Sequence, residues 1–148
     1  MMLISHRGNT HGIGLKYENE PKYVEDALQL ADGVEVDVWY HLGQFYTGHD
    51  GPQWAVKNEW LENDRFFIHA KNGPAYIRLN EMKLVADVFW HDQEPYTYTR
   101  KGYVWCYPGR LPAGQNSIAV MPELSHWTIE DCRKYEFVGV VTDYLGKE

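Results

Sequence analysis

The sequence predicts an α/β fold built on a largely parallel sheet, and three observations support this prediction. Short runs of apolar and β-branched residues recur along the 148 residues. Patterns typical of amphipathic helices fall between several of these runs. Polar and titratable side chains follow directly after most of them. Strands that alternate with helices favour parallel pairing, because a parallel neighbour is reached only through a crossover connection.

Eight strands are expected from the apolar runs. They cover residues 2–5, 33–39, 44–47, 66–70, 86–90, 103–107, 117–121 and 138–142. The link between the second and third runs is too short for a crossover, so these two strands are expected to form a hairpin.

Three segments show helical patterns. Segments 24–31 and 75–85 repeat apolar residues at the spacing of one helix face. In segment 75–85 the apolar stripe consists of Ile77, Leu79, Met82 and Val85. The third segment, 127–135, contains Thr128, a favourable N-cap, and Asp131 three residues later.

Length and composition favour one domain over residues 1–148 and exclude several classes of protein. The formal net charge is −7, which argues against a nucleic-acid-binding surface, because such surfaces are basic. No apolar stretch approaches the ~20 residues that cross a bilayer. Arg7 and His11 interrupt the apolar start, so no signal peptide is expected. Cys106 and Cys132 lack metal-site spacing and are expected to be buried thiols in a reducing cytoplasm.

Two carboxylates in segment 33–38 give the most specific chemical signal. Glu35 and Asp37 alternate with valines, so in a strand both carboxylates point to one face and the valines to the other. Neighbouring carboxylates repel each other, and burying them without a cation is costly. An oxygen-liganded divalent metal ion removes this cost. A solvated face of an antiparallel sheet is the alternative interpretation.

Titratable side chains also follow the other predicted strands, where the sites of open α/β sheets and barrels lie. These residues are His6, Arg7, His49, His69, Lys71, His91, Asp92, Glu123 and Asp143. One such residue would carry little information. Together with Asp37 at the end of the second predicted strand they occupy seven strand ends, and this repetition predicts a site at the carboxyl edge of the sheet.

Four motifs in chain order resemble the glycerophosphodiester phosphodiesterases. The wider group includes bacterial phosphatidylinositol-specific phospholipase C and the spider-venom phospholipase D enzymes. The motifs are His6-Arg7-Gly8, Glu18-Asn19 before Pro21, the segment 33–38, and Gly48-His49-Asp50. Their order and spacing match over residues 3–51, and the segment 139–143 is similar to the family's final barrel strand. The middle of the chain matches only loosely.

The resemblance implies a TIM-like (β/α) barrel. A full barrel takes about 250 residues, whereas this chain has 148. We therefore expect a minimised or incomplete barrel of about seven barrel strands, with some crossover helices shortened or lost.

The resemblance also implies a function, that of a metal-dependent phosphodiesterase hydrolysing a small glycerophosphodiester-like substrate. The implied roles are acid–base catalysis for His6 and His49, metal binding for Glu35 and Asp37, and phosphate binding for Arg7 and Lys71. A substrate with a hydroxyl next to the phosphate, such as a glycerol ester, is expected to react through a cyclic phosphate.

The third metal ligand departs from the family pattern. Where the family has Glu-x-Lys, this chain has His69-Ala70-Lys71. The carboxylates favour Mg²⁺ or Ca²⁺ as the cofactor, whereas His69 as a ligand would favour Mn²⁺ or Zn²⁺, because imidazole suits softer metals. Alternatively, His69 contacts the phosphate or the leaving group, or has a structural role.

Further residues are candidates for the wall of a substrate pocket, namely Trp39, Trp90, His91 and Glu123. His91 is equally well interpreted as a buried structural histidine, and Glu123 as a residue that caps loop amides. The segment 96–99 is expected to be an exposed loop.

Two other functions stay open. One is a catalytically weak protein that binds phosphate or a sugar phosphate, and the other is a lyase that releases a cyclic phosphate. The expected partner is a small phosphodiester or phosphorylated molecule, with neither nucleic acid nor a membrane span. A shortened barrel leaves sheet edges that often need covering, and a homodimer would cover them.

Overall fold

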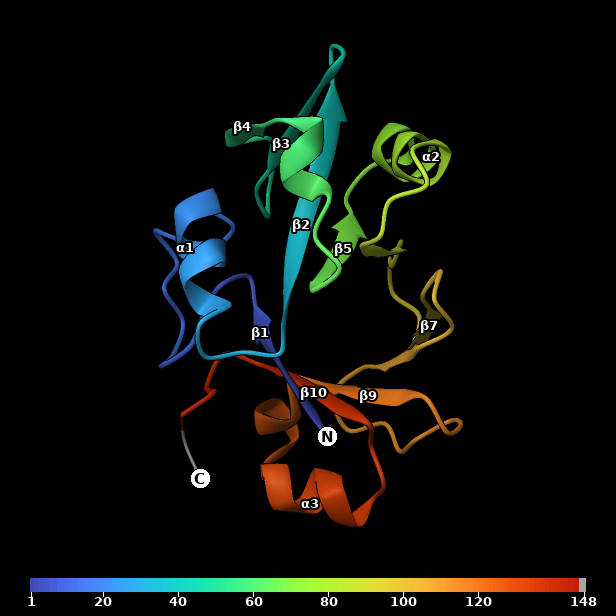
Figure 1. The fold of residues 1–148 in the computed structure, drawn as a ribbon. Coiled ribbons are helices and arrows are strands. Elements are labelled where there is room, and N and C mark those ends of the chain that lie inside the picture. The colour runs from blue at the N-terminus through green and yellow to red at the C-terminus, as the bar shows by residue number, and fades with distance from the viewer. Residues whose placement is uncertain (147–148) are drawn as a thin grey trace.

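The computed structural model describes residues 1–146, and Figure 1 shows their arrangement. The strands in this part of the chain are β1 (Met2–His6), β2 (Gly33–His41), β3 (Gln44–Thr47), β4 (Trp54–Val56), β5 (Phe66–Ala70), β6 (Asp87–Phe89), β7 (Tyr96–Tyr98), β8 (Val104–Cys106), β9 (Ser117–Val120) and β10 (Gly139–Thr142). The helices are α1 (Pro21–Ala27), α2 (Gly73–Glu81) and α3 (Ile129–Lys134), with 3₁₀ helices at Asn58–Leu61 and Pro122–Ser125. The α/β class is as predicted.

Seven of the described strands pair in parallel, in the spatial order β6-β5-β2-β1-β10-β9-β8. β1, β2, β5 and β6 are successive neighbours, as are β8, β9 and β10, and the last strand, β10, lies beside the first, β1. The sheet curls into a half-barrel with few helices around it (Figure 1). β3 and β4 extend the β2 side of the sheet in antiparallel pairing.

Each of the eight predicted strands is present, with ends that shift by two residues at most. The predicted hairpin is the antiparallel pair β2–β3. β4 and β7 were not predicted. The expectation of an exposed loop at 96–99 was partly wrong: β7 pairs with β8, and Thr97 and Thr99 are buried, whereas Tyr98 is 73% exposed.

The helices are shorter than the patterns predicted. α2 ends at Glu81, and its buried side chains are Ala75 and Leu79. The predicted apolar stripe was partly wrong, since Ile77 is 60% exposed. The N-cap of α3 is as predicted, because Thr128 forms a reciprocal capping box with the third helical residue.

Aromatic side chains fill the interior between the two edges of the half-barrel. The ring centroid of Trp105 on β8 lies 4.7 Å from that of Phe89 on β6 and 5.6 Å from that of Phe67 on β5. Arg100, in the turn between β7 and β8, donates from its backbone N–H to Val88 O in β6. Ring packing and this hydrogen bond therefore link the edges, although the β6 and β8 ladders do not pair.

Arg65 links the carboxyl end of α1 to the sheet through side-chain hydrogen bonds. Its guanidinium and Nε–H donate to the backbone oxygens of Leu28, Ala31 and Asp32. Hydrogen bonds from charged donors contribute more than neutral ones, so Arg65→Ala should lower the free energy of unfolding by about 2 kcal/mol. Denaturant unfolding measures this loss.

The matched control is Arg78→Ala, which removes only an exposed ion pair with Glu81. Its expected effect is below about 0.5 kcal/mol. Equal losses in the two arginine variants would contradict the role given to Arg65.

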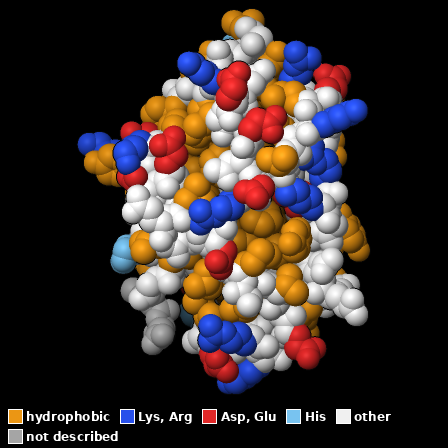
Figure 2. All heavy atoms as spheres, in the orientation of Figure 1, with side chains coloured by type: hydrophobic (Ala, Val, Ile, Leu, Met, Phe, Trp, Pro, Cys, Tyr) orange, Lys and Arg blue, Asp and Glu red, His pale blue; other side chains and the backbone are white. Residues whose placement is uncertain are grey.

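Three further predictions concern the cysteines, membrane-spanning helices and the charged surface. Cys106 and Cys132 are both buried and free, as predicted. No helix within residues 1–146 combines the length and apolar character needed to cross a bilayer. On the face drawn in Figure 2, acidic and basic side chains are interspersed.

Candidate functional site

The register of the parallel strands brings the predicted residues together. His6 at the end of β1 lies beside Glu35 of β2, and Asp37 lies beside His69 of β5. His6 ends β1 and His69 is the penultimate residue of β5, at the carboxyl ends as expected, whereas Glu35 and Asp37 lie within the longer strand β2. A pocket of about 430 Å³ opens there. The predicted residues that line it are His6, Arg7, Glu35, His49, His69, Lys71, Trp90, His91 and Asp92.

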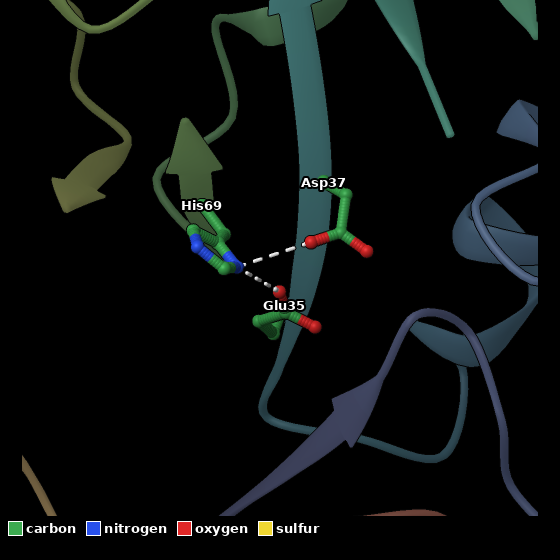
Figure 3. Close-up of side chains that lie close together, drawn as sticks. All are labelled: Glu35, Asp37 and His69. Carbon is green, nitrogen blue, oxygen red and sulfur yellow. Dashed lines mark ion pairs between the residues drawn. The ribbon is translucent and has the colours of Figure 1, made fainter. Parts of the chain in front are cut away.

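Glu35, Asp37 and His69 form a compact cluster at this pocket (Figure 3). One ligand atom from each lies within 4.8 Å of the others. His69 Nδ1 is 3.1 Å from Asp37 Oδ1 and 3.7 Å from Glu35 Oε1. Glu35 Oε2 and Asp37 Oδ1 are buried without a hydrogen-bond donor. Orphaned carboxylate oxygens beside an imidazole nitrogen fit the ligand set of a divalent metal ion.

The two carboxyl groups differ electrostatically. Burial raises the pKa of Glu35, and the nearby Asp37 raises it further. Burial also acts to raise the pKa of Asp37, but the close approach of His69 Nδ1 and the charge of Arg7 outweigh it, so this pKa lies well below its ordinary value. Asp37 is therefore ionised at neutral pH, and Glu35 is the carboxyl that gains most from an added cation.

His6 is held by a carboxylate from the last strand. Its Nδ1 lies 2.8 Å from Asp143 Oδ1, and its Nε2 lies 3.9 Å from Glu35 Oε2. The carboxylate contact favours a proton on Nδ1 and leaves Nε2 as the basic nitrogen. Burial acts to lower the pKa of His6, but Asp143 and Glu35 outweigh it and raise the pKa above its ordinary value.

Two cations flank Asp37 at the pocket. Arg7 Nε lies 3.0 Å from Asp37 Oδ2, and Lys71 Nζ lies 3.9 Å from Asp37 Oδ1. Arg7 has a left-handed backbone with φ 56°, and Gly8 follows with φ 93°. A Cβ on Gly8 would lie 2.6 Å from the Tyr23 ring, so this turn requires glycine. The turn thus aims the Arg7 guanidinium back at β2.

His49 reaches the pocket from the loop after β3. Its Nδ1 lies 2.6 Å from Asp50 Oδ1, and its side chain is 42% exposed. Trp39 does not line the pocket, although it was a candidate for its wall. Its indole N–H instead donates to Gly48 O at 2.7 Å, so Trp39 holds the loop that carries His49.

Trp39→Phe should loosen this loop. The variant keeps an aromatic ring but removes a hydrogen bond worth about 1 kcal/mol. We expect roughly five-fold faster amide hydrogen exchange at residues 48–51. The control is Trp60→Phe, which removes an indole donor to Glu25 away from the pocket. Unchanged exchange in the Trp39 variant would contradict the assigned role.

The other wall candidates are placed differently. The ring of His91 stacks on Tyr107 with centroids 3.6 Å apart, and its Nδ1 lies 3.0 Å from Thr97 Oγ1. Glu123 lies outside the pocket and lines a second cavity beside α3. Its Oε1 accepts a hydrogen bond from the Asp143 backbone N–H, so Glu123 caps a loop amide, the alternative role predicted for it.

Several pocket residues were not singled out from the sequence. Trp105, Tyr107, Val120 and Val141 line the pocket. Asn19, part of the Glu18-Asn19 motif, forms two hydrogen bonds with Asp37. Its Nδ2 donates to Asp37 Oδ2 at 2.9 Å, and its Oδ1 accepts from the Asp37 backbone N–H at 2.8 Å. The motif itself was the available signal for Asn19.

Comparison with known proteins adds no assignment: no family model matches the chain, and no curated protein sequence matches it. What the site can do therefore follows from its side chains and their distances.

Proposed function

We propose that the protein is a metal-dependent phosphodiesterase that hydrolyses a small glycerophosphodiester-like substrate. The observation that carries the proposal is the content of one pocket. It holds a buried cluster that fits a divalent cation, two cationic side chains, and a histidine with an oriented basic nitrogen. A phosphodiester is anionic and repels nucleophiles, so its cleavage needs positive charge, a base and an acid.

Glu35, Asp37 and His69 are the residues that would hold the ion. A bound divalent cation neutralises charge on the phosphate oxygens and polarises the ester. Mg²⁺ or Ca²⁺ suits the two carboxylates, and Mn²⁺ or Zn²⁺ suits the imidazole.

The remaining side chains divide the proton transfers and the binding. His6 Nε2 takes a proton from a hydroxyl next to the phosphate or from water, and Asp143 stabilises the imidazolium that forms. Arg7 and Lys71 attract the anionic phosphate to the pocket. His49 donates a proton to the leaving alkoxide, and its exposure allows it to exchange protons with solvent.

The proposal also concerns the fold. We propose that the half-barrel is a minimised TIM-like barrel of the glycerophosphodiester phosphodiesterase kind. Three features support this: parallel strands in chain order, β1 beside β10, and a pocket at the carboxyl ends of the strands. Within the described residues, no α-helix lies between β8 and β9, and this observation supports the proposal of a barrel that has lost some crossover helices.

Cleavage assays on a small panel test the function. The panel is glycerophosphocholine, glycerophosphoethanolamine, glycerophosphoinositol and a chromogenic bis-aryl phosphate. Each compound is incubated with Mg²⁺, Ca²⁺, Mn²⁺, Zn²⁺ or chelator. Metal-dependent cleavage is the expected result, and phosphorus NMR of the product separates hydrolysis from release of a cyclic phosphate. Confirmed metal binding without cleavage of any compound would contradict the proposal and favour a phosphate-binding role.

A further inference from the structure

Asn9, directly after the His6-Arg7-Gly8 motif, has a side chain that is 0% exposed and saturated with hydrogen bonds. Its Nδ2 donates to Glu18 Oε1 at 2.9 Å and to Asp143 Oδ1 at 2.7 Å. Its Oδ1 accepts from the Gly14 backbone N–H and from the Tyr23 hydroxyl, both at 3.0 Å. A primary amide has two N–H donors and an oxygen with two lone pairs, so every bonding direction is used.

These partners allow one orientation of the amide. If the Asn9 carboxamide were turned over, its oxygen would face the two carboxylates and its NH₂ would face the Gly14 N–H. Glu18 and Asp143 are themselves buried, at 7% and 1% exposure. Buried carboxylates need donors, and Asn9 supplies one N–H to each.

Both carboxylates continue to residues of the site. Asp143 Oδ1, which accepts from Asn9, also lies 2.8 Å from His6 Nδ1. Glu18 Oε2 lies 3.3 Å from the Arg7 guanidinium. The Asn9 amide is thus connected to the His6 imidazole through Asp143 and to the Arg7 guanidinium through Glu18.

We infer that Asn9 is a positioning residue: it fixes the two carboxylates that orient His6 and Arg7. The inference rests on the proposed function, in which His6 is the base and Arg7 contacts the phosphate. Asn9 does not line the pocket, so it acts only through these residues. Outer partners of this kind contribute roughly 10–100-fold to activity in other sites.

NMR of the His6 Nδ1–H proton tests the inference without a substrate. A proton held between imidazole and carboxylate gives a downfield signal, and His6→Ala identifies it in the full chain. Asn9→Leu, which keeps the approximate shape but removes all four side-chain hydrogen bonds, should lose or broaden this signal. Tyr23→Phe is the matched control: it removes one bond to the Asn9 oxygen and leaves both carboxylate contacts, so its signal should persist.

A purely structural role would lower the unfolding temperature of Asn9→Leu while leaving the His6 proton signal unchanged, and that result would overturn the inference. Should the leucine variant fail to fold, Asn9→Asp carries the same test. It keeps both acceptor contacts, loses both donors, and should also lose the signal. A persistent signal in the folded aspartate variant would equally overturn the inference.

Kinetics give a second readout. Asn9→Leu should lower kcat/KM roughly 10-fold, because it disturbs the orientation of both the base His6 and the phosphate-binding Arg7. Tyr23→Phe should keep kcat/KM. If the wild-type protein cleaves no phosphodiester, the proposed function fails, while the NMR experiment still decides whether Asn9 positions His6.

Discussion

Replacing His6 by alanine is expected to reduce phosphodiester cleavage by about 10²–10⁴-fold, the usual contribution of a positioned acid or base. The imidazole is 2.8 Å from Asp143, and its other nitrogen faces Glu35 of the Glu35–Asp37–His69 cluster at 3.9 Å. The variant removes the proton acceptor while Asn9 still donates to Asp143. Turnover is measured with the most effective metal ion, and thermal unfolding checks that the fold is kept.

The matched control is His41→Ala, an exposed histidine at the end of β2. It should retain its turnover, which excludes a general effect of losing an imidazole. Added imidazole should partly restore cleavage by the His6 variant, because the removed group leaves space at the pocket. A folded His6→Ala protein with most of its activity would contradict the assignment of His6 as the base.

The strands could be predicted because each carries its signal locally. Runs such as 66–70 are apolar and β-branched, and the short link before Gln44 permits only a hairpin. β7 was missed because Tyr96-Thr97-Tyr98 has the polar and aromatic composition of a surface turn. The pairing of β7 with β8, which accompanies the burial of Thr97, is not revealed by a local pattern.

The candidate site was predictable in its residue types more than in its contacts. Alternation placed Glu35 and Asp37 on one face, but the approach of His69 to both depends on the β2–β5 register. From the sequence, Asp143 was one of several titratable residues that follow predicted strands. Only the pairing of β10 with β1, across almost the whole chain, brings its carboxylate to His6.

Trp39 shows where alternation is insufficient. It shares the parity of Glu35 and Asp37, so it was a reasonable candidate for the pocket wall. However, β2 pairs with β5 only as far as Val38, and beyond that residue it continues as the hairpin with β3. Trp39 therefore lies past the parallel sheet, where its indole N–H supports the His49 loop.

Glu35→Gln is expected to separate two effects of the buried carboxylate pair. The pair lowers the stability of the metal-free protein, and it stabilises the protein when a divalent ion is bound. Burial and Asp37 raise the pKa of Glu35 above its ordinary value of 4.5, so the folded protein binds more protons than the unfolded chain above that pH. The stability of the metal-free wild type should therefore fall as the pH rises from 4.5 through the raised pKa. Glutamine does not titrate, so without metal at pH 7 the variant should equal or exceed the wild type in stability.

A divalent ion should reverse this order. An ion at 100 times its Kd stabilises the folded state by about 2.7 kcal/mol, and the variant, which lacks one charged ligand, should gain far less. Thermal unfolding with chelator and with each of Mg²⁺, Ca²⁺, Mn²⁺ and Zn²⁺ measures both effects. The exposed Glu59→Gln serves as the control and should respond to metal as the wild type does. Equal stabilisation of Glu35→Gln would mean that the ion binds elsewhere, and the Glu35–Asp37–His69 cluster would then no longer support metal-dependent cleavage in this pocket.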